Sequence, residues 1–196
     1  HYDDEKFDDD RVGLLSAIRE SGIERIINVG ASIKGAKDSV LLSRKYEYIY
    51  AAVGVHPSEI DDLNDESIGW IKDAAGNEEK VVAIGEIGLD YYWEDTPHDV
   101  QQKWFREQIR LAERLGMPIA IHDREAHGDV LRILKEEKAF ENIRVLMHCY
   151  SGSAEFAKEL LALGCFFSIS GVVTYKNNRK AKGVIDAIPM DHMLIE

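Results

Sequence analysis

The sequence predicts an α/β fold of the (β/α)8 barrel type, on three observations. Short runs that are apolar on both faces alternate with amphipathic stretches along the chain, which is typical of parallel strands covered by helices. The chain has 196 residues, 45% of them hydrophobic, enough for one sizeable core. Ligand-type side chains follow three of the runs, at Glu86, His122 and His148, and such barrels build their sites where the strands end.

Seven strands are expected, each short and apolar. They cover residues 25–30, 49–55, 81–87, 118–121, 144–147, 165–170 and 193–196. The chain starts without Met and stops on an apolar run, so one strand of an eight-stranded barrel is expected to precede His1. We therefore expect the natural protein to be longer at both ends.

Helices are expected between the strands, at residues 9–21, 35–46, 65–75, 97–115, 126–138, 153–163 and 178–187. The clearest is 97–115. Thr96 is a good N-cap, Pro97 suits the first helical position, and Gly116 ends the helix. Its apolar stripe consists of Phe105, Ile109, Ala112 and Leu115.

The whole chain, residues 1–196, is expected to form a single domain, because it contains no linker or low-complexity tract. A doubly wound open sheet is the alternative fold. That fold normally carries a glycine-rich phosphate fingerprint after its first strand, and the sequence Val-Gly-Ala-Ser at 29–32 does not match one.

The charge balance is acidic, with 36 Asp and Glu against 24 Lys and Arg and a net charge of -12. The composition therefore indicates no broad basic face for duplex DNA. A polyanionic substrate would need local positive charge, which bound cations can supply. Cys149 and Cys165 form no CxxC pair, so a reducing, cytoplasmic compartment is expected. No apolar run reaches the length of a membrane span.

Four side chains at strand ends are candidate metal ligands or site residues: His56, Glu86, His122 and His148. One such histidine alone would be interpreted as a strand cap, but three of them together with Glu86 favour a site. Alternation places Glu86 on the same face as Val82 and Ile84, toward the barrel axis, where a carboxylate needs a metal or a buried salt bridge. Imidazole and carboxylate suit Zn, Mn or Fe, with Mg where oxygen ligands dominate.

Two features point to phosphate binding. Arg124 follows His122 by two residues and could fork onto a phosphate, although a loop salt bridge with Asp123 or Glu125 explains it equally well. Residues 149–153 end a strand and open a helix, so their backbone N–H groups could cradle an anion. Helix capping by Ser151 or Ser153 is the alternative for this segment.

Four motifs together resemble the TatD family of metal-dependent deoxyribonucleases, a branch of the amidohydrolase-like barrels. They are GVHP at 54–57, GEIGLDY at 85–91, IHDR at 121–124 and HCYSG at 148–152. The resemblance covers essentially the whole chain, with the motifs in family order. It supports the barrel fold that the strand pattern predicts.

The resemblance implies two divalent metal ions (Mg, Mn or Zn). The implied ligands are His1, Glu86, His122 and His148. Glu86 would be the catalytic residue and bridge the ions, with His1 on one ion and His122 and His148 on the other. The residues implied to position the scissile phosphate are His56, Arg124 and Tyr150. Two further ligands, a His before His1 and an Asp after Glu196, would lie outside this sequence.

The implied activity is hydrolysis of DNA phosphodiesters from the 3′ end of single strands. DNA ends would be the partner, with no membrane and no obligate protein partner. Two alternatives stay open. One is a metal-dependent hydrolase of a small ester, lactone or amide, since fold and ligands do not choose the substrate. The other is a non-catalytic barrel that binds nucleic acid or a partner, against which the intact Glu86, His122 and His148 argue.

Overall fold

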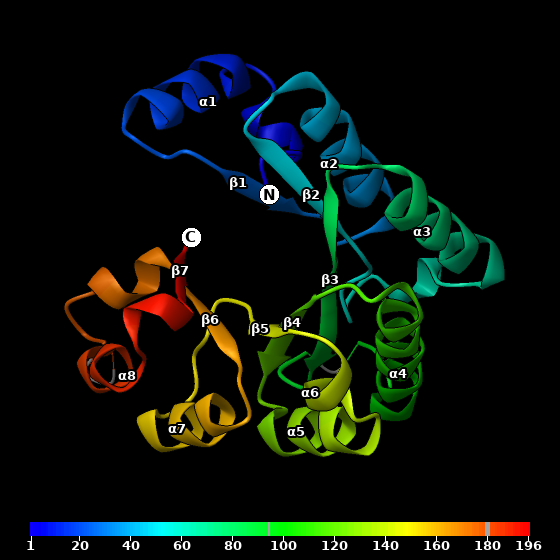
Figure 1. Ribbon diagram of the computed structural model, residues 1–196, viewed down its shortest axis with the longest axis vertical. Helices are drawn as coiled ribbons and strands as arrows, with labels where there is room; N and C mark the ends of the chain where they lie inside the picture. Colours follow the sequence, from blue (N-terminus) through cyan, green and yellow to red (C-terminus); the bar gives the residue numbers. More distant parts are fainter. Residues whose placement is uncertain (94, 179–180) are drawn as a thin grey trace.

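The computed structural model describes residues 1–93, 95–178 and 181–196. Its strands form one parallel sheet in which each strand pairs with the next along the chain, in the order β1 to β7. The sheet curls into part of a barrel, with the helices on its outer side (Figure 1). This arrangement confirms the predicted α/β fold of the barrel type.

All seven predicted strands are present, and two of them are longer than expected. The strands are β1 (Ile26–Val29), β2 (Ile49–Val53), β3 (Val81–Asp90), β4 (Ile119–Arg124), β5 (Val145–Met147), β6 (Phe166–Ile169) and β7 (Met193–Ile195). β3 and β4 remain paired as far as Asp90 and Arg124. The expected ends at residues 87 and 121 are therefore wrong: β3 continues three residues further, and His122 lies within β4 and not after it.

The helices are α1 (Arg11–Glu20), α2 (Ile33–Lys45), α3 (Asp65–Asn77), α4 (His98–Leu115), α5 (His127–Glu136), α6 (Ala139–Asn142), α7 (Ala154–Ala162) and α8 (Ala181–Ala187). Short 3-10 helices cover Glu5–Phe7, Ile60–Asp62, Gly171–Thr174 and Met190–His192. The short helix α6 was not predicted. Of the helix expected at 178–187, Asn178 is not helical, residues 179–180 lie outside the described residues, and α8 covers Ala181–Ala187.

The predicted start of α4 is wrong by one residue. Pro97 occupies the N-cap position and the helix begins at His98, so Thr96 does not cap it. The carbonyl of Thr96 instead accepts a hydrogen bond of 3.1 Å from Gln101 Nε2. The predicted apolar stripe is buried at Phe105, Ile109 and Ala112 and partly buried at Leu115, and the left-handed Gly116 ends the helix as expected.

A bulge in β3 changes the direction of the side chains around Glu86. Between the pairs Ile84–Ile119 and Ile87–Ile121, β3 contains one residue more than β4. Such an extra residue interrupts the alternation of side chains and is common beside active sites. The simple alternation from Val82 through Ile84 to Glu86 therefore does not hold, although Glu86 is buried as expected.

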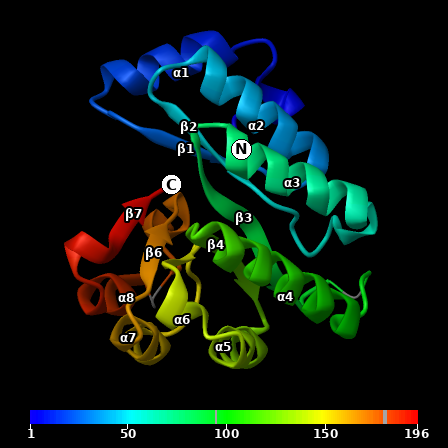
Figure 2. The same ribbon diagram turned by 45° about the vertical axis from the view of Figure 1, so that its right-hand side comes forward.

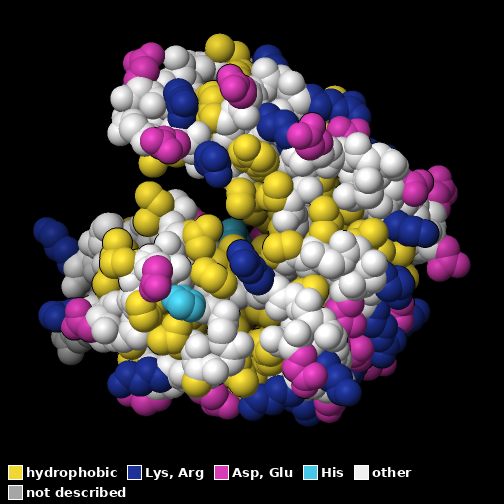
Figure 3. Space-filling model, in the orientation of Figure 1, with side chains coloured by type: hydrophobic (Ala, Val, Ile, Leu, Met, Phe, Trp, Pro, Cys, Tyr) yellow, Lys and Arg dark blue, Asp and Glu magenta, His cyan; other side chains and the backbone are white. Residues whose placement is uncertain are grey.

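The core fills the space between the sheet and the outer helices, and its largest fully buried side chains include Phe105, Phe167, Ile84 and Ile119. Both ends of the chain lie at the open side of the curled sheet, beside β1 and β7 (Figures 1 and 2). In the space-filling view this open side is a hollow bordered largely by hydrophobic side chains (Figure 3). Among the described residues, no helix combines the length and the apolar character that crossing a membrane requires.

Candidate metal centre

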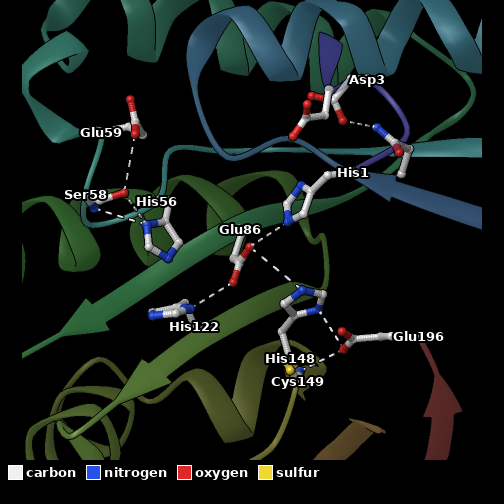
Figure 4. A network of polar contacts seen from close by, with 12 residues as sticks. His1, Asp3, His56, Ser58, Glu59, Glu86, His122, His148, Cys149 and Glu196 are labelled. Atoms are coloured by element: carbon white, nitrogen blue, oxygen red, sulfur yellow. Dashed lines mark hydrogen bonds and ion pairs between the residues drawn. The ribbon is translucent and has the colours of Figure 1, made fainter. Parts of the chain in front are cut away.

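The carboxylate of Glu86 lies at the middle of a cluster of histidines (Figure 4). Its side chain is buried, with 4% of the residue exposed. One oxygen, Oε1, lies 3.0 Å from His122 Nδ1. The other, Oε2, lies 3.5 Å from His1 Nε2 and 3.8 Å from His148 Nε2. Glu86 therefore directs one oxygen to each side of the cluster.

The potential ligands divide into two groups around this carboxylate. His1, Glu86 and His148 form one group and His56, Asp90 and His122 the other, with the ligand atoms of each group within 4.8 Å of one another. The expectation from the resemblance placed His122 and His148 on one ion, whereas the structure groups His148 with His1. Within the second group, Asp90 Oδ2 lies 2.9 Å from His122 Nε2.

Electrostatics in the cluster are governed by burial and by the histidine–carboxylate contacts. Burial favours the neutral form of Glu86, but hydrogen bonds from His1 and His122 outweigh it and hold the pKa of this carboxyl far below its usual range. The hydrogen bond to Glu86 raises the pKa of His1. Burial lowers the pKa of His122, but its contacts with Glu86 and Asp90 prevail and raise it.

This donor set fits a divalent cation. Among the described residues, every ion-pair partner of Glu86 is a histidine, and no Lys or Arg shares its charge. A buried carboxylate normally requires a fixed cation or a metal, and imidazole nitrogens with carboxylate oxygens are the ligands of Zn and Mn. The residues present therefore suit the metal that the resemblance implies.

His56 is a hydrogen-bond donor rather than a ready metal ligand. Its Nδ1 accepts the backbone N–H of Ser58 at 3.1 Å, so in the neutral ring the proton sits on Nε2. Burial, and next the neighbouring His122, lower the pKa of His56 to about 4, so the ring is neutral at pH 7. Its ring centroid lies 4.1 Å from that of His122. This geometry suits the expected contact with a substrate phosphate.

Glu196 and Asp90 are site residues that the sequence did not single out as ligands. Glu196 Oε1 lies 3.2 Å from His148 Nδ1 and accepts the backbone N–H of Cys149 at 2.7 Å. A carboxylate on the outer nitrogen of a ligating histidine fixes the ring's orientation. Both residues stand at strand ends, Glu196 after β7 and Asp90 at the end of β3, so the strand-end rule could have found them.

Arg124 forms neither of the loop salt bridges considered from the sequence. Among the described residues, no carboxylate lies within ion-pair distance of its guanidinium, and Asp123 pairs instead with His127 at 2.8 Å. The guanidinium carbon of Arg124 lies 3.8 Å from the ring centroid of Tyr92. The loop salt-bridge alternative is therefore wrong, and within the part of the chain that the structure describes the guanidinium contacts aromatic rings and no carboxylate.

Tyr150 is half-buried and turned toward its own loop. Its hydroxyl donates a hydrogen bond of 2.7 Å to the carbonyl of Ser153, and burial raises its pKa. The structure shows no contact between Tyr150 and the histidine cluster among the described residues. Ser153 Oγ accepts the N–H of Phe156 at 3.1 Å, which confirms the capping alternative for this serine.

Comparisons with known proteins show the family to which the chain belongs. The family described as "TatD related DNase" matches residues 1–196. A Bacillus subtilis (strain 168) protein named "Uncharacterized metal-dependent hydrolase YabD" is 42% identical over 196 residues, covering 100% of this chain and 76% of that protein. A Cronobacter sakazakii protein named "3'-5' ssDNA/RNA exonuclease TatD" is 32% identical over 193 residues, covering 97% of this chain and 72% of that protein.

Solved structures show the same architecture. The crystal structure of YjjV, a TatD homologue from Escherichia coli K12, superposes with a TM-score of 0.92 at 30% identity, covering 100% of this chain and 75% of that one. A phosphotriesterase homology protein from Escherichia coli, complexed with phosphate, superposes with a TM-score of 0.68 at 16% identity, covering 92% of this chain and 69% of that one. The second likeness shows the barrel-type fold alone.

Proposed function

The chain belongs to the family of TatD-related DNases and is a metal-dependent hydrolase, and from this premise we propose that it removes nucleotides from the 3′ end of single-stranded DNA. The observation that carries the proposal is the position of Glu86, with one oxygen toward His122 and the other toward His1 and His148. A shared carboxylate between two sets of ligands is the arrangement of two-metal phosphodiesterases.

We assign the residues as follows. His1, Glu86 and His148 would hold one ion. Glu86 and His122 would hold the other through Oε1 and Nδ1, which lie 3.0 Å apart, and Asp90 would orient the His122 ring through its contact with Nε2. Divalent ions bound there would supply Lewis-acid polarisation of the phosphate and activation of water. Glu196 would orient the His148 ring through its contact of 3.2 Å with Nδ1.

Two side chains would position the phosphate. His56 is neutral at pH 7 and carries its proton on Nε2, so it would donate a hydrogen bond to a phosphate oxygen. Arg124 has no carboxylate partner among the described residues and would supply a charge-assisted hydrogen bond to the same group. The acidic net charge of -12 does not oppose this, since positive charge is required only where the strand end enters the site.

The experiment is digestion of a short single-stranded oligonucleotide labelled at either end, with Mg²⁺ or Mn²⁺ and with chelator. We expect the 3′ label to be released first as a mononucleotide, the 5′-labelled strand to shorten stepwise, and chelator to stop both. The same assay on an RNA strand and on a lactone and an ester panel compares the substrate classes. Turnover of the small esters without nucleotide release would overturn the proposal.

A matched pair of variants ties the activity to the cluster. Glu86→Gln keeps the size of the side chain but removes the charge that both groups share, so we expect turnover to fall by at least about a hundredfold. Glu159→Gln removes an exposed carboxylate on α7 that pairs with Lys135 at 3.2 Å, and should leave turnover unchanged. Equal activity of the two variants would remove Glu86 from the mechanism.

A further inference from the structure

Two exposed aromatic side chains follow β3 directly beside the metal centre. Tyr92 and Trp93 are each 53% exposed, and their rings meet edge to face with centroids 4.9 Å apart. Arg124, at the end of the neighbouring strand β4, lies over both rings. We refer to Tyr92, Trp93 and Arg124 as the aromatic ledge. Large aromatic rings that are exposed to solvent beside a site often mark a ligand-binding or protein-binding surface.

Within the described residues, the arginine of the ledge contacts aromatic rings and no carboxylate. Its guanidinium carbon lies 3.8 Å from the Tyr92 centroid and 5.7 Å from the Trp93 centroid. In a chain with 36 acidic residues, no described carboxylate comes within ion-pair distance of this side chain. Stacking fixes the plane of the guanidinium while its N–H donors stay available to an anion.

The Asp90 side chain and the pairing of β3 with β4 connect the ledge to the metal centre. Asp90 Oδ1 accepts the N–H of Tyr92 at 3.0 Å, while Asp90 Oδ2 lies 2.9 Å from His122 Nε2. On the neighbouring strand, Arg124 pairs in register with Asp90, and its carbonyl accepts the N–H of Tyr91 at 2.9 Å. Asp90 therefore contacts both His122 of the metal centre and Tyr92 of the ledge.

We propose that the aromatic ledge is a stacking subsite for an unpaired nucleobase of the strand whose phosphate lies at the metal centre. This inference rests on the proposed function and specifies its substrate class. Rings stack on any base, so the ledge would hold a strand without reading its sequence. Bases in a duplex are already stacked and paired, so the ledge favours single strands. Arg124 would contact the phosphate next to the stacked base.

The test measures binding without turnover, by fluorescence anisotropy of a labelled oligonucleotide in chelator. Each protein is titrated with a normal single strand and with the same strand carrying abasic residues at its 3′ end. Trp93→Ala should weaken binding of the normal strand by about tenfold or more, and binding of the abasic strand hardly at all. Trp93→Phe, which keeps a ring, should bind both strands as the wild type does.

Two controls separate the ledge from general surface effects. Leu41→Ala removes an exposed apolar side chain on the outer face of α2, 56% exposed, and should change neither affinity. Arg124→Ala should weaken binding of both strands equally, because both strands carry the phosphates. Arg114→Ala removes an exposed arginine near the opposite end of β4 and should weaken neither.

The outcomes distinguish the ledge from the proposed function. The stacking subsite is overturned if Trp93→Ala loses equal affinity for the normal and abasic strands, or loses affinity for neither. This holds even where the wild type degrades DNA. If Trp93→Ala loses affinity for the normal strand alone, and the wild type with Mg²⁺ or Mn²⁺ hydrolyses no DNA, the subsite is supported and the nuclease activity is overturned. An unchanged unfolding midpoint for each variant shows that the comparison concerns binding and not folding.

Discussion

At the scale of single residues, Asp90 is the side chain that connects the candidate metal centre to the aromatic ledge. It is 5% exposed, and its two oxygens contact His122 Nε2 and the backbone N–H of Tyr92. A neutral amide would lose the charge that His122 faces while keeping the shape. We expect Asp90→Asn to lower the affinity for divalent ions by about 10- to 100-fold, measured by isothermal titration calorimetry.

The control for this prediction is another aspartate–histidine pair. Asp191 Oδ1 lies 3.1 Å from His192 Nδ1, but this aspartate is exposed and the pair lies outside the cluster. Asp191→Asn should bind metal as the wild type does. Metal affinity that is unchanged in Asp90→Asn would show that His122 needs no support from this carboxylate.

At the scale of elements, the close approach of β3 and β4 depends on Gly88. This residue has a φ of 149°, and a Cβ added there would lie 2.0 Å from the carbonyl oxygen of His122. Gly88→Ala therefore combines backbone strain with a steric clash inside the sheet, and we expect a loss of at least about 3 kcal/mol in the free energy of unfolding. Urea unfolding at pH 7 measures it.

Gly69 in α3 is the matched glycine, because a Cβ added there would meet no neighbouring group within 4 Å. Gly69→Ala should leave the free energy of unfolding unchanged or raise it by about 0.5–1 kcal/mol, the usual gain for a helix interior. If both alanine variants were equally stable, the close approach of the two strands at Gly88 would not be a constraint on the fold.

The helices α4 and α5 are joined by an ion cluster on Glu137. Its side chain is 11% exposed and contacts Arg106 Nη1 at 2.7 Å and Arg110 Nε at 2.8 Å. Burial alone would raise the pKa of this carboxyl, but the hydrogen bonds from Arg110 and Arg106 outweigh it and lower the pKa. Its stabilising effect is therefore present above the pKa of the unfolded chain and lost as the pH falls through the lower folded value.

We expect Glu137→Gln to lower the free energy of unfolding by about 1–3 kcal/mol at pH 7. The difference from the wild type should shrink as the pH falls below about 4, where the unfolded carboxyl becomes protonated. Denaturant unfolding at several pH values measures both effects. Glu136→Gln, at the more exposed neighbour of Glu137, should lower the free energy of unfolding clearly less than Glu137→Gln does. A difference that grows toward acid pH would contradict the assigned sign.

At the scale of the whole molecule, buried parallel strands made the fold predictable. All seven strands and their order follow from short apolar runs separated by helical stretches. The ends of β3 and β4 were not predictable in this way, because Gly88, Asp90 and Arg124 are not apolar although their backbones still pair. The short helix α6 was missed because Lys138, in the left-handed conformation, separates it from α5 at a point without a sequence signal.

The sequence predicted which strand-end residues form the site, but it did not predict which of them contact one another. The rule that barrel strands carry ligands at one end identified Glu86, His122 and His148, which the structure brings together. Which histidines share an oxygen of Glu86 depends on contacts between residues far apart in sequence, and the bulge in β3 alters the expected alternation. The stacking of Arg124 on Tyr92 is likewise a tertiary contact that no local sequence pattern predicts.

The central claim is that Glu86 joins two metal positions, and anomalous diffraction from crystals of the protein grown with Mn²⁺ tests it most directly. We expect two anomalous peaks flanking the Glu86 carboxylate, one beside His1 and His148 and the other between Glu86 Oε1 and His122 Nδ1. A single peak, or peaks that leave the Glu86 oxygens without a metal neighbour, would contradict it.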